Sequence, residues 1–138
     1  RAVVRLRDVP ADGLKILFSA ASGTYPLIEP EGSEKDSIEA VLDAVLLADK
    51  FLMTEESEGL TDCCYSDLSH EILHRAWTWS RKNECSDFKI CCVSNFLTKR
   101  STKRARVRAF EEFSNDQNFG EFLDDIRVYI VNDLENNS

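Results

Sequence analysis

The stretch DSIEAVLDAVLLADKFLM, residues 36–53, decides the fold of this 138-residue chain. Most of its apolar side chains recur at steps of three and four residues, which places them on one side of an α-helix. This stripe comprises Ile38, Val41, Leu42, Val45, Ala48 and Leu52. Three further apolar side chains widen it: Leu46, Leu47 and Phe51. One neighbour could not cover so wide a surface, so we expect this helix to pack against several others and to be the most buried one.

The segments before this helix also carry patterns. Asp36 is a good N-cap, with Glu39 three residues later as the second half of a capping box. Residues 2–9, AVVRLRDV, alternate as a short half-exposed strand would. A helix follows from Pro10, with a stripe that ends at Gly23 and consists of Leu14, Leu17, Phe18 and Ala21. Residues 24–35 contain prolines and a glycine and predict a loop.

The segments after it predict further helices. TEESEG, residues 54–59, is expected to break the chain and start a new helix, with Thr54 as its cap. Helical spacing then recurs from Asp67, from Ser86 and in the last twenty residues, where helix is favoured over strand for RVYIV. The final helix is expected to carry Phe119, Phe122, Leu123, Ile126 and Ile130. The predicted fold class is therefore mainly α, a helical bundle with at most one short N-terminal strand.

Composition limits the class of protein. Hydrophobic residues make up 43% and charged residues 30% of the chain, which suits a globular protein. We find no apolar run near the roughly 18 residues that a membrane span needs. The formal charge of −8 disfavours general nucleic-acid affinity. Five cysteines without a secretion signal favour reduced thiols and a cytoplasmic or nuclear location. Because the chain opens with Arg1 and not Met, we expect it to be an excised piece.

Three passages together resemble a known family. They are VVRLRDVPADGLKILFSAASGTYP (3–26), IEAVLDAVLLADKFLM (38–53) and HRAWTWSRKNECSDFKICCVSNFL (74–97). The first resembles the strand, turn and helix of a BTB/POZ domain, and the second resembles its next helix, which ends here as Ala-Asp-Lys-Phe-Leu-Met. The third is similar to the first helix pair of the BACK-like extension found in fungal BTB proteins. The resemblance implies two parts, residues 1–66 from the C-terminal half of a BTB/POZ domain and residues 67–138 as a helical extension.

The resemblance also implies a function. BTB domains are non-catalytic scaffolds or adaptors, some of which hold substrates for ubiquitin ligases, so a protein partner is expected, with a cullin as one candidate. The implied contact region consists of Leu14, Phe18, Tyr25, Asp49, Lys50 and Phe51. BTB domains commonly self-associate, but the N-terminal strands and helices that carry much of that interface are absent from this chain. The resemblance therefore predicts no particular oligomeric state and no cofactor.

An enzymatic alternative comes from HEILH, residues 70–74. In an HExxH motif, two histidines one helical turn apart bind zinc, and the glutamate activates a bound water. If HEILH works in this way, the chain is a small zinc metallopeptidase with Glu71 as the catalytic base. His70 and His74 are the only histidines, so a carboxylate would have to be the third ligand: Glu111, or else Glu84 or Glu112. A structural zinc site could instead combine the histidines with Cys63 or Cys64 and Cys85.

One basic run interrupts the acidic chain. KRSTKRARVR, residues 99–108, contains six cations: Lys99, Arg100, Lys103, Arg104, Arg106 and Arg108. Such a run is typical of a nuclear localisation signal or a phosphate-binding patch. It is also typical of a solvated helix face whose cations pair with nearby carboxylates such as Glu111 and Glu112. The sequence favours the solvated face.

Overall fold

The structure is a computed structural model, and it describes residues 10–23, 37–66 and 68–136. These residues form seven helices and no strand, so the mainly α prediction is confirmed. The predicted strand at residues 2–9 and the loop at 24–35 lie outside the described residues. Within the described part of the chain, no helix combines the length and apolar character needed to cross a bilayer. Contacts divide the chain into two compact units, residues 1–67 and 68–138.

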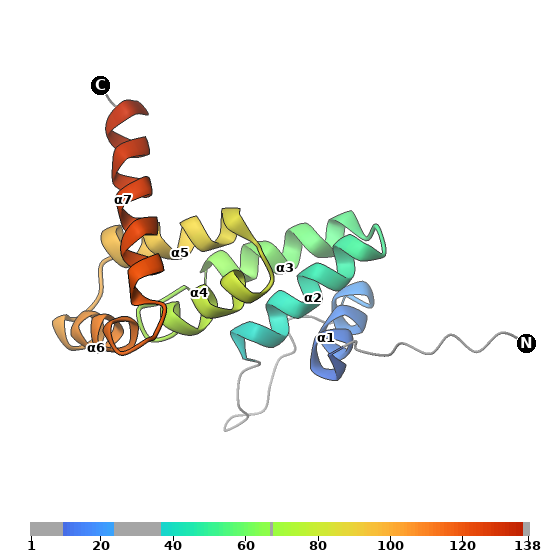
Figure 1. The fold of residues 1–138 in the computed structure, drawn as a ribbon. Coiled ribbons are helices and arrows are strands. Elements are labelled where there is room, and N and C mark those ends of the chain that lie inside the picture. The colour runs from blue at the N-terminus through green and yellow to red at the C-terminus, as the bar shows by residue number, and fades with distance from the viewer. Residues whose placement is uncertain (1–9, 24–36, 67, 137–138) are drawn as a thin grey trace, which may run out of the picture. The chain divides into compact units, whose positions relative to one another are not determined.

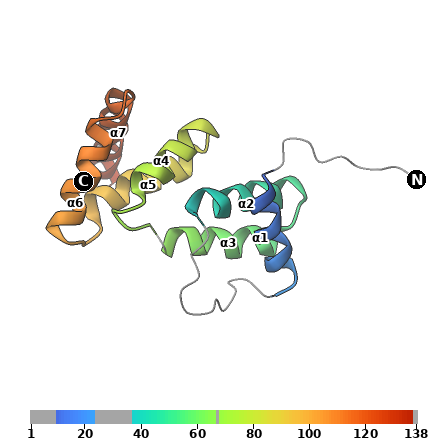
Figure 2. The ribbon, with the colours of Figure 1, turned by 90° about the horizontal axis from the view of Figure 1, so that it is seen from below.

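The first unit contains three helices, α1 (Ala11–Ala21), α2 (Ile38–Lys50) and α3 (Thr54–Ser66). Helices α2 and α3 lie side by side and α1 packs against both of them (Figures 1 and 2). Helix α2 has more buried residues than any other helix in the described residues: Ile38, Ala40, Val41, Leu42, Ala44, Leu47 and Ala48. The prediction that this helix is the most buried one is confirmed, and it is buried because it faces two neighbours.

A glycine lets α1 and α2 approach closely. Gly13 is buried in α1, and a Cβ atom built on it would lie 2.9 Å from Asp43 Cβ and 3.2 Å from the Ala44 backbone nitrogen. No real Cβ makes contacts as short as the first of these, so any side chain at residue 13 would push the two helices apart. Gly13 therefore sets the spacing at the centre of this unit.

Several details of the first unit differ from the sequence prediction. Ser37, and not Asp36, is the N-cap of α2, and its hydroxyl accepts a hydrogen bond from the Ala40 N–H. Phe18 and Ala21 of the predicted α1 stripe are exposed, while Ile16 is buried. Leu52 is 87% exposed because α2 ends before it. The apolar spacing in the sequence continues past the end of the helix and therefore predicts that Leu52 is buried. In the structure, the last buried residue of α2 is Ala48.

Two helices end on residues in the left-handed conformation that normally favours glycine. After α2, Leu52 has φ of +57°, and the Met53 and Leu52 N–H groups donate to the carbonyls of Ala48 and Asp49. After α4, Glu84 has φ of +54° with the same pair of bonds, from Cys85 to Ser80 and from Glu84 to Arg81. This pattern is the Schellman motif, in which the left-handed residue is usually glycine because other residues strain against their own Cβ.

Replacing Leu52 with glycine should therefore stabilise the first unit. The left-handed conformation costs a non-glycine residue about 1–2 kcal/mol, and the extra backbone entropy of glycine offsets about 0.5–1 kcal/mol of that gain. Since Leu52 packs against little, we expect Leu52→Gly to raise the free energy of unfolding by about 0.5–1 kcal/mol, measured by urea denaturation followed by circular dichroism. The control is Gly23→Ala, at φ of +74°, which should lower it. A destabilised Leu52→Gly variant would contradict this account of the helix end.

The second unit contains α4 (Leu73–Lys82), α5 (Ser86–Thr98), α6 (Lys103–Ser114) and α7 (Phe119–Asn136). Its core is an aromatic cluster, defined as Trp77, Phe96, Phe113 and Phe122, with one member from each helix. Phe113 and Phe122 stack with ring centroids 3.7 Å apart, and both meet Trp77 and Phe96 edge-on at 5.2–5.7 Å. This edge-on and stacked geometry is the one that aromatic quadrupoles favour, so the cluster joins all four helices.

Helix boundaries in the second unit also differ from prediction. Helix α4 begins at Leu73 and not near Asp67, because residues 70–72 form a turn. The C-terminal segment is a helix as predicted, but only Phe122 of its expected apolar face is buried. The second half of α7 extends past the other helices of this unit (Figure 1), and Ile130, Val131 and Leu134 on it are exposed. No element among the described residues fully covers these three side chains.

Candidate functional site

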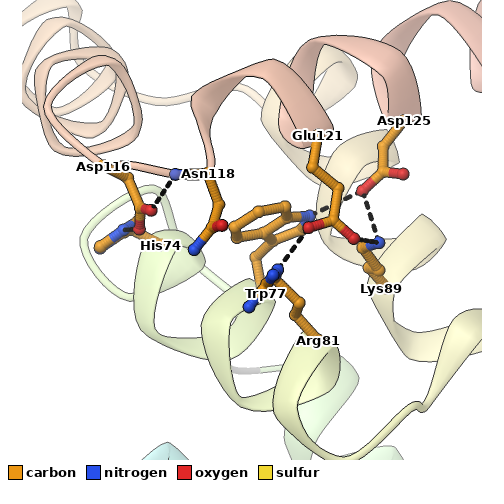
Figure 3. A network of polar contacts seen from close by, with 8 residues as sticks. All are labelled: His74, Trp77, Arg81, Lys89, Asp116, Asn118, Glu121 and Asp125. Carbon is orange, nitrogen blue, oxygen red and sulfur yellow. Dashed lines mark hydrogen bonds and ion pairs between the residues drawn. The ribbon is translucent and has the colours of Figure 1, made fainter.

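A network of polar side chains surrounds the buried Trp77 (Figure 3). The indole Nε1–H donates to Asp125 Oδ2 at 2.9 Å, and Lys89 Nζ lies 3.2 Å from the same oxygen. Lys89 also bonds Glu121 Oε1 at 2.9 Å, and Arg81 bonds the other oxygen of Glu121. Because these residues come from α4, α5 and α7, the network ties three helices together around one tryptophan.

The charges in this network shift each other's pKa. Burial lowers the pKa of Lys89, but its hydrogen bonds to Glu121 and Asp125 and the charges of both carboxylates outweigh burial and raise it overall. Hydrogen bonds from Arg81 and Lys89 lower the pKa of Glu121. The shifted pKa values of Lys89 and Glu121 therefore favour the charged forms of these two groups, which are the forms that stabilise the fold.

A second part of the network lies on the other side of Trp77 (Figure 3). His74 Nε2 lies 2.7 Å from Asp116 Oδ2, and the imidazole meets the Phe113 ring edge-on at 5.1 Å. The Asn118 backbone N–H donates to Asp116 Oδ1 at 2.7 Å. This backbone bond, followed by the bond to His74, lowers the pKa of Asp116. Asp116 thereby ties the turn between α6 and α7 to α4.

These shifts predict acid destabilisation of the second unit. A carboxyl group whose pKa is lowered by folding stabilises the protein above its unfolded pKa, and that stability is lost as the pH falls through the folded value. We therefore expect the second unit to be less stable at about pH 3 than at pH 7, because unfolded carboxyls titrate near pH 4. Asp116, with 14% of its side chain exposed, should contribute more than Glu121 at 39%.

Urea denaturation at the two pH values, followed by tryptophan fluorescence, measures this effect. Both tryptophans, Trp77 and Trp79, lie in α4, so the fluorescence reports the second unit. An Asp116→Asn variant should lose less stability on acidification than the wild type. Equal losses in the two proteins would contradict the role given to Asp116.

The HEILH motif does not lie on one helix, as a zinc-binding HExxH motif requires. His70 and Glu71 precede α4, and His74 lies within it. His70 is 1% exposed and its Nε2 bonds the Phe96 carbonyl at 3.0 Å, so it satisfies one of the last carbonyls of α5. His74 bonds Asp116, and the carboxylate nearest its Nδ1 is Glu112, at 3.8 Å, rather than Glu111. In this structure both histidines hold helices together.

No group of three or more His, Cys, Asp or Glu residues in the described part of the chain is arranged to hold a metal ion. None of the five cysteines forms a disulfide, and Cys64 and Cys92 are buried while Cys63, Cys85 and Cys91 are half-buried. Burial raises the pKa of the Cys91 thiol, which keeps it protonated and less reactive. The zinc sites considered from the sequence therefore have no assembled ligand set among the described residues.

The implied contact region is partly at the surface. Phe18 is 61% exposed, Phe51 is 44% exposed and Lys50 is exposed, whereas Leu14 is half-buried. Asp49 accepts a hydrogen bond from the hydroxyl of Ser57, so it ties α2 to α3. Tyr25 lies outside the described residues. The contact region implied by the resemblance does not include Leu52, although Leu52 is exposed next to Phe51.

Helix α3, which follows Phe51 and Leu52 in the sequence, carries a shallow depression. Ala20 of α1 and residues from the first turns of α3 line it, and these are Glu55, Glu56, Gly59, Leu60 and Cys63. Its volume of about 210 Å³ is below the range of about 300–1,000 Å³ that is usual for small-molecule sites. It suits one side chain of a partner better than a substrate. We call Phe51, Leu52 and this depression the α2–α3 surface.

The basic run lies outside the aromatic cluster. Lys99 and Arg100 precede α6, and four cations lie on its first two turns: Lys103, Arg104, Arg106 and Arg108. All four are exposed. In the described part of the chain, no ion pair joins any of them to Glu111 or Glu112, although such pairing was the favoured interpretation of the sequence.

No family model, curated protein or solved structure matches this chain.

Proposed function

We propose that this chain is a non-catalytic protein-interaction scaffold or adaptor that contacts its partner through the α2–α3 surface. The observation that carries this proposal is Leu52, a large apolar side chain that is 87% exposed on a left-handed backbone. It costs conformational energy and contributes almost no packing within the unit, so the fold alone does not account for it. Burial of Leu52 by a protein partner would account for it.

The neighbouring side chains support a protein partner. Phe51 is 44% exposed beside Leu52, and full burial of a large apolar side chain contributes about 1.5–3 kcal/mol. In the sequence, the exposed Lys50 directly precedes this apolar pair and Glu55 and Glu56 follow it within four residues, so charged side chains flank the pair along the chain. An apolar centre with a polar rim is the usual anatomy of a protein interface.

The BTB/POZ resemblance gives the proposal its finer form. The residues implied by it and exposed here, Phe18, Lys50 and Phe51, would be contact residues, and the adaptor would act in the cytoplasm or nucleus. A cullin of a ubiquitin ligase is the partner class to test first. Purified cullin N-terminal regions titrated against this chain test that form separately, because their failure to bind would remove the cullin while other protein partners remain.

A crosslinking experiment tests the surface without assuming the partner. A photoreactive amino acid replaces Leu52 in one protein and the exposed Lys82 of α4 in a control protein. We expect a specific adduct from residue 52 and not from residue 82, and the adduct identifies a partner that can then be purified. Titration of that partner should give a weaker affinity for Leu52→Asp than for Leu134→Asp, which places the same charge on α7. Adducts of equal yield at the two positions would overturn the proposal.

A further inference from the structure

The first two turns of α6 form a cationic surface that the fold does not explain. Helix α6 has no acidic residue in its first turn, and its cations oppose the positive end of the helix dipole there. Arg104 and Arg108 stand four residues apart, a spacing at which like charges repel. None of the four cations of α6 takes part in an ion pair within the described residues. The arrangement therefore weakens the helix without compensation inside the unit.

Apolar side chains lie among these charges. Val107 is 47% exposed and Phe110, one turn further on, is 50% exposed. Val107 lines one shallow depression together with Lys103, Arg104, Arg108 and Glu111. A ligand on this surface would therefore meet two or three cations around an apolar centre, with a carboxylate at one edge.

We propose that this α6 surface binds an acidic, amphipathic protein segment. Carboxylates of the segment would pair with Lys103, Arg104 and Arg108, and one of its apolar side chains would cover Val107. Charge complementarity favours an acidic ligand, and the apolar centre favours a peptide over a phosphate backbone. Glu111 at the edge and the net charge of −8 also disfavour nucleic acid. This surface lies on the second unit and the proposal does not depend on the α2–α3 surface.

A designed peptide tests this proposal with the intact chain. The probe is a fluorescent helical peptide that places leucines on one face and glutamates beside them, and its controls are a scrambled peptide of the same composition and a single-stranded RNA. We expect the patterned peptide to bind at least about tenfold more tightly than the scrambled one, with an affinity that falls as salt is added. Val107→Ser should weaken binding severalfold.

Charge-reversal variants test whether the peptide binds at the α6 surface. The variant Arg104→Glu/Arg108→Glu should bind the peptide at least about tenfold more weakly than wild type. The matched control Lys82→Glu/Arg127→Glu makes the same change in net charge on exposed cations of α4 and α7 and should change affinity much less. Equal losses in the two double variants, or no binding of the patterned peptide, would overturn the proposal. So would tighter binding of the RNA with no effect of Val107→Ser, because that result would identify a phosphate-binding surface.

Discussion

Phe113→Ala should lower the free energy of unfolding of the second unit by about 4 kcal/mol. Phe113 is fully buried and its ring contacts all three other members of the aromatic cluster, as well as His74 at 5.1 Å. Truncation removes the transfer free energy of a phenyl ring and leaves a cavity that Trp77 and Phe122 cannot both fill without losing their other contacts. A native protein has only about 5–15 kcal/mol of stability in total, so the variant should be close to unfolding.

The chain supplies a matched control for this effect. Phe110 lies three residues earlier on the same helix, is 50% exposed and makes one ring contact, edge-on to Phe119 at 6.0 Å. We expect Phe110→Ala to cost less than about 1 kcal/mol. Urea denaturation followed by tryptophan fluorescence reports both variants, since both tryptophans belong to this unit. Similar losses for the two variants would contradict the role of the aromatic cluster.

Gly13→Ala should destabilise the first unit, by about 1–3 kcal/mol. In an ordinary helix, replacing glycine with alanine stabilises by up to about 1 kcal/mol, because alanine loses less backbone entropy. At residue 13 the added methyl would lie 2.9 Å from Asp43 Cβ and close to the backbone of α2, which cannot move aside as a flexible side chain could. The steric cost should therefore exceed the gain in helix propensity and change the sign of the effect.

Gly59→Ala provides the comparison. Gly59 lies within α3, is exposed and has open space where its Cβ would be. This substitution should stabilise the unit by about 0.5–1 kcal/mol. Circular dichroism of the two variants during denaturation gives both values, since the first unit contains no tryptophan. A stabilised Gly13→Ala variant would show that α1 and α2 do not approach as closely as the structure has them.

The sequence predicted the elements better than their ends. Apolar periodicity located α2 correctly because it is a local property of the chain. The periodicity carried no information about where the helix stops, so Leu52 was assigned to the core although α2 ends at Lys50. Similarly, Leu68 and Ile72 suggested a helix from Asp67, but α4 begins only at Leu73. The turn before it is held by the bond from His70 to the Phe96 carbonyl, a contact between residues far apart in sequence.

The roles of individual residues were harder to predict for the same reason. HEILH matches a zinc motif by spacing alone. Its histidines bond the Phe96 carbonyl on α5 and Asp116 after α6, and no local sequence pattern predicts these contacts. No local pattern marks Gly13 as a packing position, and its importance comes from Asp43 on the next helix. The basic run is expected to pair with its acidic neighbours, but among the residues that the structure describes the exposed cations of α6 form no ion pair. Long-range contacts decide each of these cases.

The affinity of the Leu52→Gly variant for a partner identified through crosslinking from residue 52 tests the proposed function most directly. This substitution relieves backbone strain and removes the exposed side chain, so stability and binding should change in opposite directions. We expect its unfolding free energy to rise and its affinity, measured by calorimetric titration, to fall at least about tenfold, the size expected for a central interface residue. A stabilised variant that binds the partner as tightly as the wild type would contradict the proposal that Leu52 is retained for binding.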